Sequence, residues 1–360
     1  MSTAAHDPEA PAAPADPVLS VRDLRAWYGT PRGPVRAVDG VSFDLRPGET
    51  LGVVGESGCG KSSLGRAILG LLPPGSATDG AVDFRGTDLL GLSPRELRAL
   101  RGPDLGLIFQ EPMTRLNPLM RISEHFEEAL RTHEPKLSAA EVRERSLEAL
   151  RGMGIPPSRY HNHPHEFSGG MRQRIMIALA LVLRPAFVVA DEPTTALDVL
   201  VEAQIIQILA DLRRGFDTAL VLITHNLGIV AEACDRVAVM YAGRIVEQGE
   251  AREVFASPRH PYTRELLRST ISLTTTGLHS IPGAPPDLVR PPAGCRFHPR
   301  CPDAMRVCAA VEPPDVRLAS GVRSACWQQA VRVPGALPAE YQENGREPLA
   351  AEEIRVADEA

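Results

Sequence analysis

The segment Gly55–Ser62, with the sequence GESGCGKS, most strongly constrains what this 360-residue chain can fold into. It has the form G-x-x-x-x-G-K-S, which is typical of the phosphate-binding loop of nucleotide hydrolases. The apolar run 51–54 before it predicts a buried strand. Apolar residues three or four apart after it, from Leu64 to Leu71, predict a helix. A strand, a glycine-rich loop and a helix in this order indicate a nucleoside triphosphate site in an α/β fold.

The residues of this loop have separate predicted roles. Glycine lets backbone N–H groups turn inward around phosphate oxygens at angles that other residues resist, and the next helix points its positive end at the same anion. We expect Lys61 to reach the outer phosphates, the Ser62 hydroxyl to bind Mg²⁺, and Cys59 to contribute only its backbone. The predicted nucleotide-binding residues here are Gly55, Glu56, Ser57, Gly58, Cys59, Gly60, Lys61, Ser62 and Ser63.

Polar residues follow three other apolar runs that we predict to be buried strands. They are Gln110 after 105–109, Asp191 and Glu192 after 187–190, and His225 after 220–224. Parallel α/β sheets place their ligand sites at the carboxyl ends of strands. We therefore expect these four side chains to lie beside the phosphate-binding loop.

Hydrolysis of a β–γ phosphate bond needs charge neutralisation and an oriented water, and these residues can supply both. Asp191 is suited to bind Mg²⁺ opposite Ser62. Glu192 is the natural general base or water-orienting group. His225 can hydrogen-bond the γ-phosphate and the water, and Gln110 can contact Mg²⁺ and the water together.

The rest of the chain can be divided by its residue patterns. Residues 18–28 predict a strand that ends at Tyr28, which either stacks on a nucleotide base or packs at the rim of the site. Residues 111–165 have charged helical faces and predict a helical subdomain set into the α/β core. Capping boxes predict helix starts at Ser93 and Ser138. Beyond residue 254 the chain becomes proline-rich and irregular, and we expect the core domain to end there.

The net charge of −6 is concentrated at the two ends of the chain. Residues 1–17 contribute −3 and residues 340–360 contribute −5, which leaves the remainder at about +2. Such a balance favours neither a nucleic-acid surface nor an acidic one. Both ends are rich in Ala, Pro and Glu, so we expect 1–17 and 331–360 to be disordered tails.

The N-terminal residues have neither a basic start nor an apolar core, so the sequence predicts no signal peptide. The longest uncharged apolar run, 175–183, is far shorter than the roughly 18 residues of a membrane span. We expect a protein that is soluble and cytoplasmic by itself.

Four of the six cysteines, Cys295, Cys301, Cys308 and Cys326, are clustered late in the chain. Their spacing is neither the paired C-x2-C of common zinc ribbons nor a ferredoxin spacing. In a reducing compartment such a cluster suggests a metal rather than disulfides. The residues alone leave zinc, an iron–sulfur cluster, and free or disulfide-bonded cysteines open.

Taken together, these motifs resemble those of the ATP-binding subunits of ABC transporters. Residues 55–62 match the Walker A motif, and 187–192 match the Walker B motif with its catalytic glutamate. The other matches are the Q-loop at Gln110, the D-loop at 195–198, the switch histidine at His225 and the signature at 167–171, with Met171 where a glutamine is common.

The chain also resembles a narrower group, the ATPases of oligopeptide and dipeptide importers. The segments that match this group are 110–118, 190–199, 239–247, 260–263 (HPYT) and 294–301 (GCRFHPRC). Two departures, Arg115 for a usual serine and Asn226 for a frequent aspartate, flank the chemistry and do not alter it.

The resemblance implies an α/β P-loop NTPase core of the ABC ATPase type with an N-terminal antiparallel β part. The ATPase domain would span 18–254, including the helical subdomain at about 111–165, and a Cys-containing C-terminal region would span 255–330. It further implies a 4Fe–4S cluster on the four late cysteines, with a structural role and with zinc as the alternative.

The resemblance also implies partners. Ser168, Gly169 and Gly170 of the signature would act in trans on ATP bound to a second ATPase subunit, usually a paralogue. The helical subdomain, with Glu166, would contact two membrane permeases, which receive solute from a binding protein. The chain would then be peripheral to the cell membrane on its cytoplasmic side, and ATP, Mg²⁺ and no nucleic acid would be its ligands.

Three other functions remain to be weighed against a peptide importer. A soluble ABC ATPase acting on nucleic acid or ribosomes usually has two cassettes or a long coiled-coil insert, and neither is present. An exporter ATPase usually has a fused membrane domain and would not explain residues 260–326. Import of another solute, such as nickel, stays open because selectivity resides in the binding protein and permeases.

Overall fold

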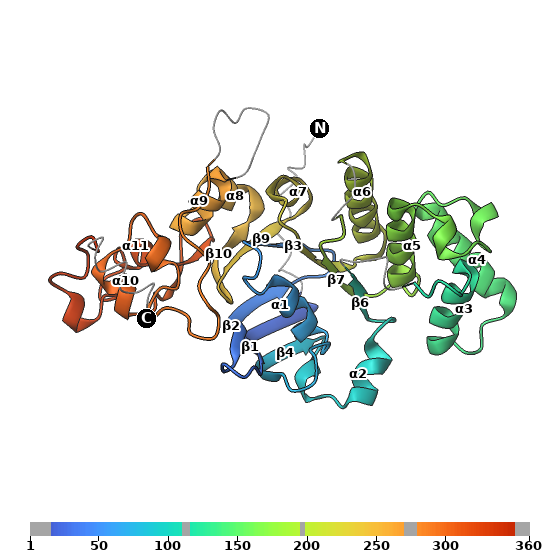
Figure 1. Cartoon of the computed structure of the whole chain (residues 1–360), viewed down its shortest axis with the longest axis horizontal. Coiled ribbons are helices and arrows are strands. Elements are labelled where there is room, and N and C mark those ends of the chain that lie inside the picture. Colours follow the sequence, from blue (N-terminus) through green and yellow to red (C-terminus); the bar gives the residue numbers. More distant parts are fainter. Residues whose placement is uncertain (1–15, 110–115, 195–198, 270–278, 350–360) are drawn as a thin grey trace, which may run out of the picture.

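The computed structural model describes residues 16–109, 116–194, 199–269 and 279–349, which form two β-sheets with helices between and around them (Figure 1). The strands are β1 (Leu19–Tyr28), β2 (Val35–Leu45), β3 (Thr50–Val54), β4 (Ala77–Phe84), β5 (Thr87–Asp88), β6 (Leu105–Ile108), β7 (Phe187–Asp191), β8 (Ala219–Ile223), β9 (Arg236–Tyr241), β10 (Arg244–Glu250), β11 (Asp315–Arg317) and β12 (Arg323–Ala325). The α-helices are α1 (Lys61–Ile68), α2 (Pro94–Leu100), α3 (Ile122–His133), α4 (Ala139–Gly152), α5 (Gly169–Leu181), α6 (Val199–Phe216), α7 (Leu227–Ala233), α8 (Ala251–Ala256), α9 (Pro261–Arg268), α10 (Arg306–Ala310) and α11 (Trp327–Ala330).

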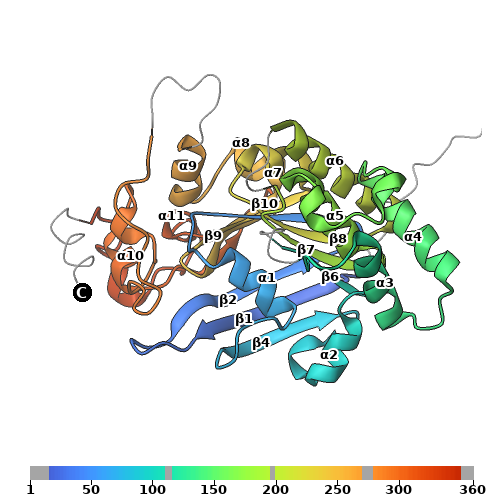
Figure 2. The same ribbon diagram turned by 45° about the vertical axis from the view of Figure 1, so that its right-hand side comes forward.

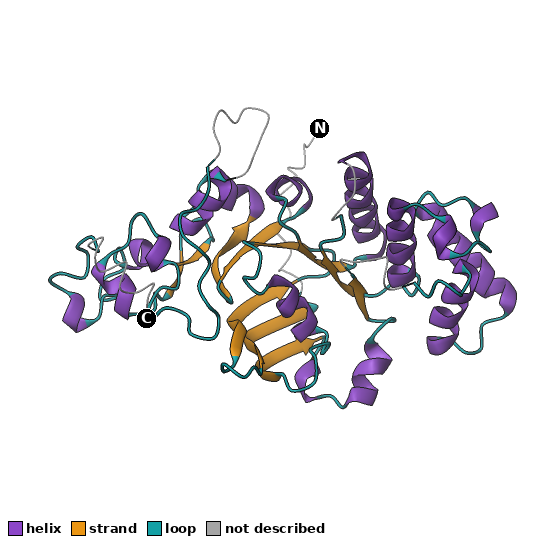
Figure 3. Ribbon diagram, viewed as in Figure 1, coloured by secondary structure: helices purple, strands orange, loops and turns teal. Residues whose placement is uncertain are grey.

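The larger sheet has the strand order β11-β12-β10-β9-β3-β8-β7-β6. Figure 3 shows the strands in orange and the helices in purple. Its central pairs β9–β3, β3–β8, β8–β7 and β7–β6 are parallel. Every residue of β3, β7 and β8 is buried, because helices or the second sheet cover both faces. The apolar runs 51–54, 187–190 and 220–224 are thus confirmed as buried strands, whereas β6 in the run 105–109 is half-buried at Leu107.

The smaller sheet is antiparallel, with the order β2-β1-β4-β5. Helix α1 lies between the two sheets and contacts β1 and β2 on one side and β7 and β8 on the other (Figure 2). Leu64, Ala67 and Ile68 of α1 are fully buried there, as their spacing predicts. Leu71 lies beyond the end of the helix and is partly exposed, so the predicted stripe is one turn too long.

Helices α3 and α4 form a lobe at one end of the molecule, next to α5 (Figure 1). Ser138 caps α4 and Ser93 caps α2, each in a complete capping box with the glutamate three residues later. These two predicted helix starts are confirmed. Both α3 and α4 lie within residues 111–165, where a helical subdomain is predicted; residues 110–115 lie outside the described residues.

The C-terminal region joins the large sheet instead of forming a separate layer. Strand β12 pairs with β10, and β11 pairs with β12, which adds two strands to the sheet edge. Residues 331–349, which we expected to be disordered, lie against this region through backbone hydrogen bonds such as Arg306 N to Glu347 O and Leu349 N to Ala304 O. Residues 1–15 and 350–360 lie outside the described residues.

Within the described part of the chain, no helix combines the length and apolar character needed to cross a membrane.

Candidate nucleotide site

The phosphate-binding loop lies at the carboxyl end of β3, where its backbone packs closely against neighbouring chain. Gly60 has a φ of 109°, and a Cβ there would overlap the carbonyl oxygen of Ala37. A Cβ at Gly55 would overlap the carbonyl oxygen of Met240 in the same way. Only glycine fits at these two positions, because the clash is with backbone that a rotamer change leaves in place.

The strand register brings the predicted catalytic groups to the same edge of the sheet. Val53 of β3 pairs with Ile223 of β8, and Ile223 also pairs with Asp191 at the end of β7. The residues that follow these three strand ends are therefore neighbours. This places Glu192 and His225 beside the loop, as the sequence predicts.

Lys61 folds back onto the loop that precedes it. Its Nζ donates to the carbonyl oxygens of Gly55 at 2.8 Å and Glu56 at 3.0 Å, and the residue is only 6% exposed. Cys59 is also buried, and burial raises the pKa of its thiol. A neutral, buried thiol agrees with the expectation that Cys59 contributes its backbone.

Ser62 and Asp191 form the predicted pair for Mg²⁺. The Ser62 hydroxyl donates to Oδ1 of Asp191 at 2.7 Å, and Asp191 is 5% exposed. Burial raises the pKa of the Asp191 carboxyl, and the hydrogen bond from Ser62 opposes this shift. A hydroxyl and a buried carboxylate at contact distance are hard oxygen donors of the kind that Mg²⁺ takes.

Glu192 and His225 face one another next to this pair. Oε1 of Glu192 lies 3.6 Å from Nδ1 of His225, and the histidine side chain is 70% exposed whereas Glu192 is 18% exposed. Glu192 has a φ of 46°, a left-handed conformation that non-glycine residues rarely adopt and that is concentrated at functional sites. The geometry suits a base held near a solvent-exposed histidine.

The structure describes Tyr28 and Asn226 among the remaining predicted residues near the site. The Tyr28 hydroxyl donates to Ser63 Oγ at 2.9 Å, which places its ring next to the start of α1. Asn226, one of the two departures, caps α7 by accepting from the N–H groups of Gly228 and Ile229. Gln110 and the predicted D-loop at 195–198 lie outside the described residues.

The signature segment begins α5. Ser168 is the N-cap, and its hydroxyl accepts from the N–H of Met171 at 3.4 Å. Ser168 and Gly169 are exposed and Gly170 is half-buried. Their polar groups thus face outward at the positive end of a helix.

Two residues at this site were missed by the sequence reasoning. Arg300 makes a two-point contact with the Glu56 carboxylate, with N–O distances of 2.7 and 3.0 Å. The Tyr262 hydroxyl accepts from the N–H of Glu56 at 2.8 Å. Tyr262 and Arg300 lie in the segments 260–263 and 294–301, which match the importer group. No local sequence pattern relates these segments to the phosphate-binding loop, which lies more than 200 residues earlier in the chain.

The four late cysteines lie in one neighbourhood and are free. Burial raises the pKa of the Cys295 thiol to about 12, with further contributions from the charges of Cys308 and Cys326. Cys308 Sγ accepts from the N–H of Met305 at 3.4 Å. Among the described residues, however, no group of three or more His, Cys, Asp or Glu side chains is arranged to hold a metal ion. The prediction of an iron–sulfur cluster is therefore not confirmed.

Comparison with known proteins identifies the family. Residues 38–195 match the family model described as ABC transporter, and 246–308 match the model described as oligopeptide/dipeptide transporter, C-terminal region. The oligopeptide transport ATP-binding protein OppD of Salmonella typhimurium is 49% identical over 319 residues, which cover 88% of this chain and 95% of that protein. The chain belongs to the ATP-binding subunits of ABC transporters. It is also 48% identical to the dipeptide transport ATP-binding protein DppD of Bacillus subtilis over 89% of this chain and 97% of that protein.

Solved structures agree with this family. A dimeric ATP-binding cassette in a post-hydrolysis state, bound to ADP and Pi, aligns with a TM-score of 0.60 and 27% identity over 65% of this chain and 99% of that one. The predicted α/β ABC ATPase fold is confirmed. As a member of this family the chain is an ATPase, and ATP with Mg²⁺ fits the loop, Ser62 and Asp191.

Proposed function

We propose that this subunit hydrolyses ATP to power the import of oligopeptides or dipeptides across the cell membrane. The observation that supports this most directly is the match of residues 246–308 to the C-terminal region of oligopeptide and dipeptide transporters. This region begins in β10 and continues beyond residue 254, where the predicted ATPase domain ends. Relatives of 48–49% identity over nearly their full length have names that specify the same solutes.

The side chains divide the reaction between them. Lys61 neutralises charge at the outer phosphates, and Ser62 and Asp191 would hold Mg²⁺, which supplies charge neutralisation of the triphosphate. Glu192 orients or deprotonates the attacking water, and His225 at 3.6 Å from Glu192 hydrogen-bonds the γ-phosphate. Gln110, which lies outside the described residues, would complete the site by contacting Mg²⁺ and the water.

ATP binds between two ATPase subunits in this proposal. The exposed N-cap Ser168 and the following Gly169 and Gly170 present the positive end of a 13-residue helix to the γ-phosphate held by the partner. A related cassette was solved as a dimer with ADP and Pi, which supports this arrangement. The partner is a paralogous ATPase. The helical subdomain contacts two permeases at the cytoplasmic side of the membrane. A solute-binding protein delivers the peptide to these permeases from the opposite side.

Uptake of a labelled tripeptide by cells lacking this subunit tests the proposal. Wild-type protein should restore uptake, and the Glu192→Gln variant, produced at the same level, should not. Restoration by Glu192→Gln would contradict ATP-driven import by this site. Normal tripeptide uptake in the deletion strain, with loss of nickel uptake instead, would replace the peptide by that metal as the solute.

We also propose that Cys295, Cys301, Cys308 and Cys326 hold a 4Fe–4S cluster. The support is that all four are free and that Cys308 and Cys326 are buried. Burial and, in addition, the charges of the neighbouring cysteines raise the thiol pKa values of Cys295 and Cys301. A cluster would fix these thiols as thiolates and add folding free energy to a small region. Protein purified without oxygen should be brown and contain about four irons per chain with equal sulfide. One zinc, or no metal, in colourless anaerobic protein would contradict the cluster.

A further inference from the structure

Glu56 in the phosphate-binding loop makes hydrogen bonds through its backbone N–H, its backbone carbonyl and its carboxylate. The N–H and the carboxylate contact residues of the C-terminal region, Tyr262 and Arg300. We propose that Arg300 and Tyr262 are positioning residues for ATP, acting through Glu56 to fix the loop in its phosphate-binding conformation. This rests on the proposed function only in requiring that the loop binds ATP. It assigns the C-terminal region a part in nucleotide binding that is exerted through Glu56.

The Arg300–Glu56 contact is a two-point ion pair in a buried setting. The two guanidinium nitrogens of Arg300 lie 2.7 and 3.0 Å from the two carboxylate oxygens of Glu56. The Arg300 side chain is 3% exposed and that of Glu56 is 24% exposed. Burial by itself lowers the pKa of Arg300, but the hydrogen bonds to Glu56 and Tyr241 raise it above its usual value, so the Arg300 guanidinium stays charged. Parallel N–H···O bonds of this kind fix orientation as well as charge.

The backbone of Glu56 is held in addition to its side chain. Tyr262, fully buried, accepts from the Glu56 N–H at 2.8 Å. The Glu56 carbonyl oxygen accepts from Lys61 Nζ at 3.0 Å. A shift of Glu56 would therefore also move the lysine that is to bind the outer phosphates.

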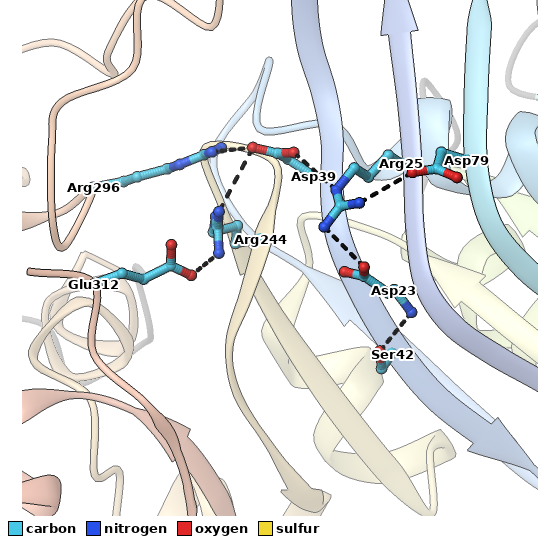
Figure 4. A network of polar contacts seen from close by, with 8 residues as sticks. All are labelled: Asp23, Arg25, Asp39, Ser42, Asp79, Arg244, Arg296 and Glu312. Carbon is cyan, nitrogen blue, oxygen red and sulfur yellow. Dashed lines mark hydrogen bonds and ion pairs between the residues drawn. The ribbon is translucent and has the colours of Figure 1, made fainter. Parts of the chain in front are cut away.

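The segment that supplies Arg300 is itself anchored to the ATPase core. Four residues earlier, Arg296 is buried and bonds both Asp39 of β2 and the carbonyl oxygen of Ala242 in the β9–β10 turn. Figure 4 shows that Asp39 is also approached by Arg25 of β1 and Arg244 of β10, so the anchor spans both sheets.

The next residue of the turn connects this anchor to the loop. The Gly243 N–H donates to the Cys59 carbonyl oxygen at 2.8 Å. The ring of Phe297 packs against those of Tyr241 and Tyr262. Its centroid lies 5.1 Å from that of Tyr241 and 5.3 Å from that of Tyr262. Such a packed segment can hold the Arg300 guanidinium in one place.

The physical effect concerns both charge and geometry. A carboxylate within a phosphate-binding loop repels a triphosphate, and its pairing with Arg300 neutralises that charge. If Arg300 is removed, the partly buried carboxylate is left unpaired, which costs more than the removal of both partners. The single variant that lacks Arg300 should therefore bind ATP more weakly than the double variant that lacks both charges. A general loss of packing would not produce this difference.

The test is a double-variant cycle read out by the affinity for an ATP analogue with a nitrogen between its β- and γ-phosphates, with Mg²⁺ present. Arg300→Gln should weaken binding by about tenfold, equivalent to 1.4 kcal/mol. Glu56→Gln should weaken it by less than about threefold, because glutamine still accepts from Arg300. The double variant should bind nearly as well as Glu56→Gln alone. Tyr262→Phe, which removes only the hydroxyl, should weaken binding by about threefold to tenfold.

Arg306→Gln is the matched control. Arg306 lies in the same C-terminal region, in α10, away from the phosphate-binding loop. Its half-exposed side chain forms an ion pair with Glu347, with an Nε–Oε2 distance of 3.4 Å. It should leave the affinity unchanged. Binding by Arg300→Gln within twofold of wild type, or a double variant as weak as Arg300→Gln, would overturn the inference. Wild-type protein that fails to bind the analogue would instead overturn the proposed function.

Discussion

Gly60→Ala should abolish ATP binding by displacing the phosphate-binding loop. Gly60 has a φ of 109°, and an added Cβ would lie well inside the 3.0 Å that real Cβ contacts keep from the carbonyl oxygen of Ala37. Because that oxygen belongs to β2 backbone, the loop or the strand must move by about 1 Å. A displacement of about 1 Å at a reacting or binding group can cost about a hundredfold. We therefore expect the ATP affinity to fall at least that far.

The same substitution should also lower the free energy of unfolding. The left-handed backbone costs about 1–2 kcal/mol for a residue with a Cβ, and overpacking adds about 1–3 kcal/mol. Gly58→Ala separates the two contributions, since Gly58 has a φ of 80° but a Cβ there has open space. Urea unfolding should show only the backbone cost in Gly58→Ala and both costs in Gly60→Ala. Equal destabilisation of the two variants, or ATP binding by Gly60→Ala within threefold of wild type, would refute the clash.

Glu192→Gln should slow ATP hydrolysis by the assembled transporter by about 10²–10⁴ and leave ATP affinity unchanged; near-normal steady-state hydrolysis would exclude Glu192 as the base. Lys61→Ala should weaken ATP binding itself, measured by titration calorimetry, because the charge of Lys61 also acts on bound ATP before reaction. The free energy of unfolding should fall below neutral pH because of His260. Burial and the charge of Arg264 lower the pKa of His260 to about 3 in the folded chain. Below about pH 6.5 the unfolded chain therefore binds a proton that the folded chain does not. Urea unfolding should show this as a loss of about 2 kcal/mol between pH 7 and pH 5. His260→Asn, which can still cap α9, should reduce that slope, and an unchanged slope would contradict the assignment.

The local parts of this protein follow from its sequence. The strand, glycine-rich loop and helix around Lys61 lie where their pattern predicts, and the capping boxes at Ser93 and Ser138 begin helices as expected. Asp191 and Glu192 could be placed at the site because they end a buried strand, and parallel strands end at a common edge. Each of these inferences depends on residues within a few positions of one another.

Only the tertiary structure decided how the C-terminal region relates to the site. Tyr262 and Arg300 reach Glu56 across sequence separations of 206 and 244 residues, and Arg296 reaches Asp39 across 257. No periodicity or cap relates residues so far apart, because such contacts are fixed by the packing of the completed sheet. The same holds for β12, whose three residues acquire a strand conformation by pairing with β10. The sequence by itself determined the chemistry of the loop, and the packing of the C-terminal region against β9, β10 and β2 determined what holds that loop in place.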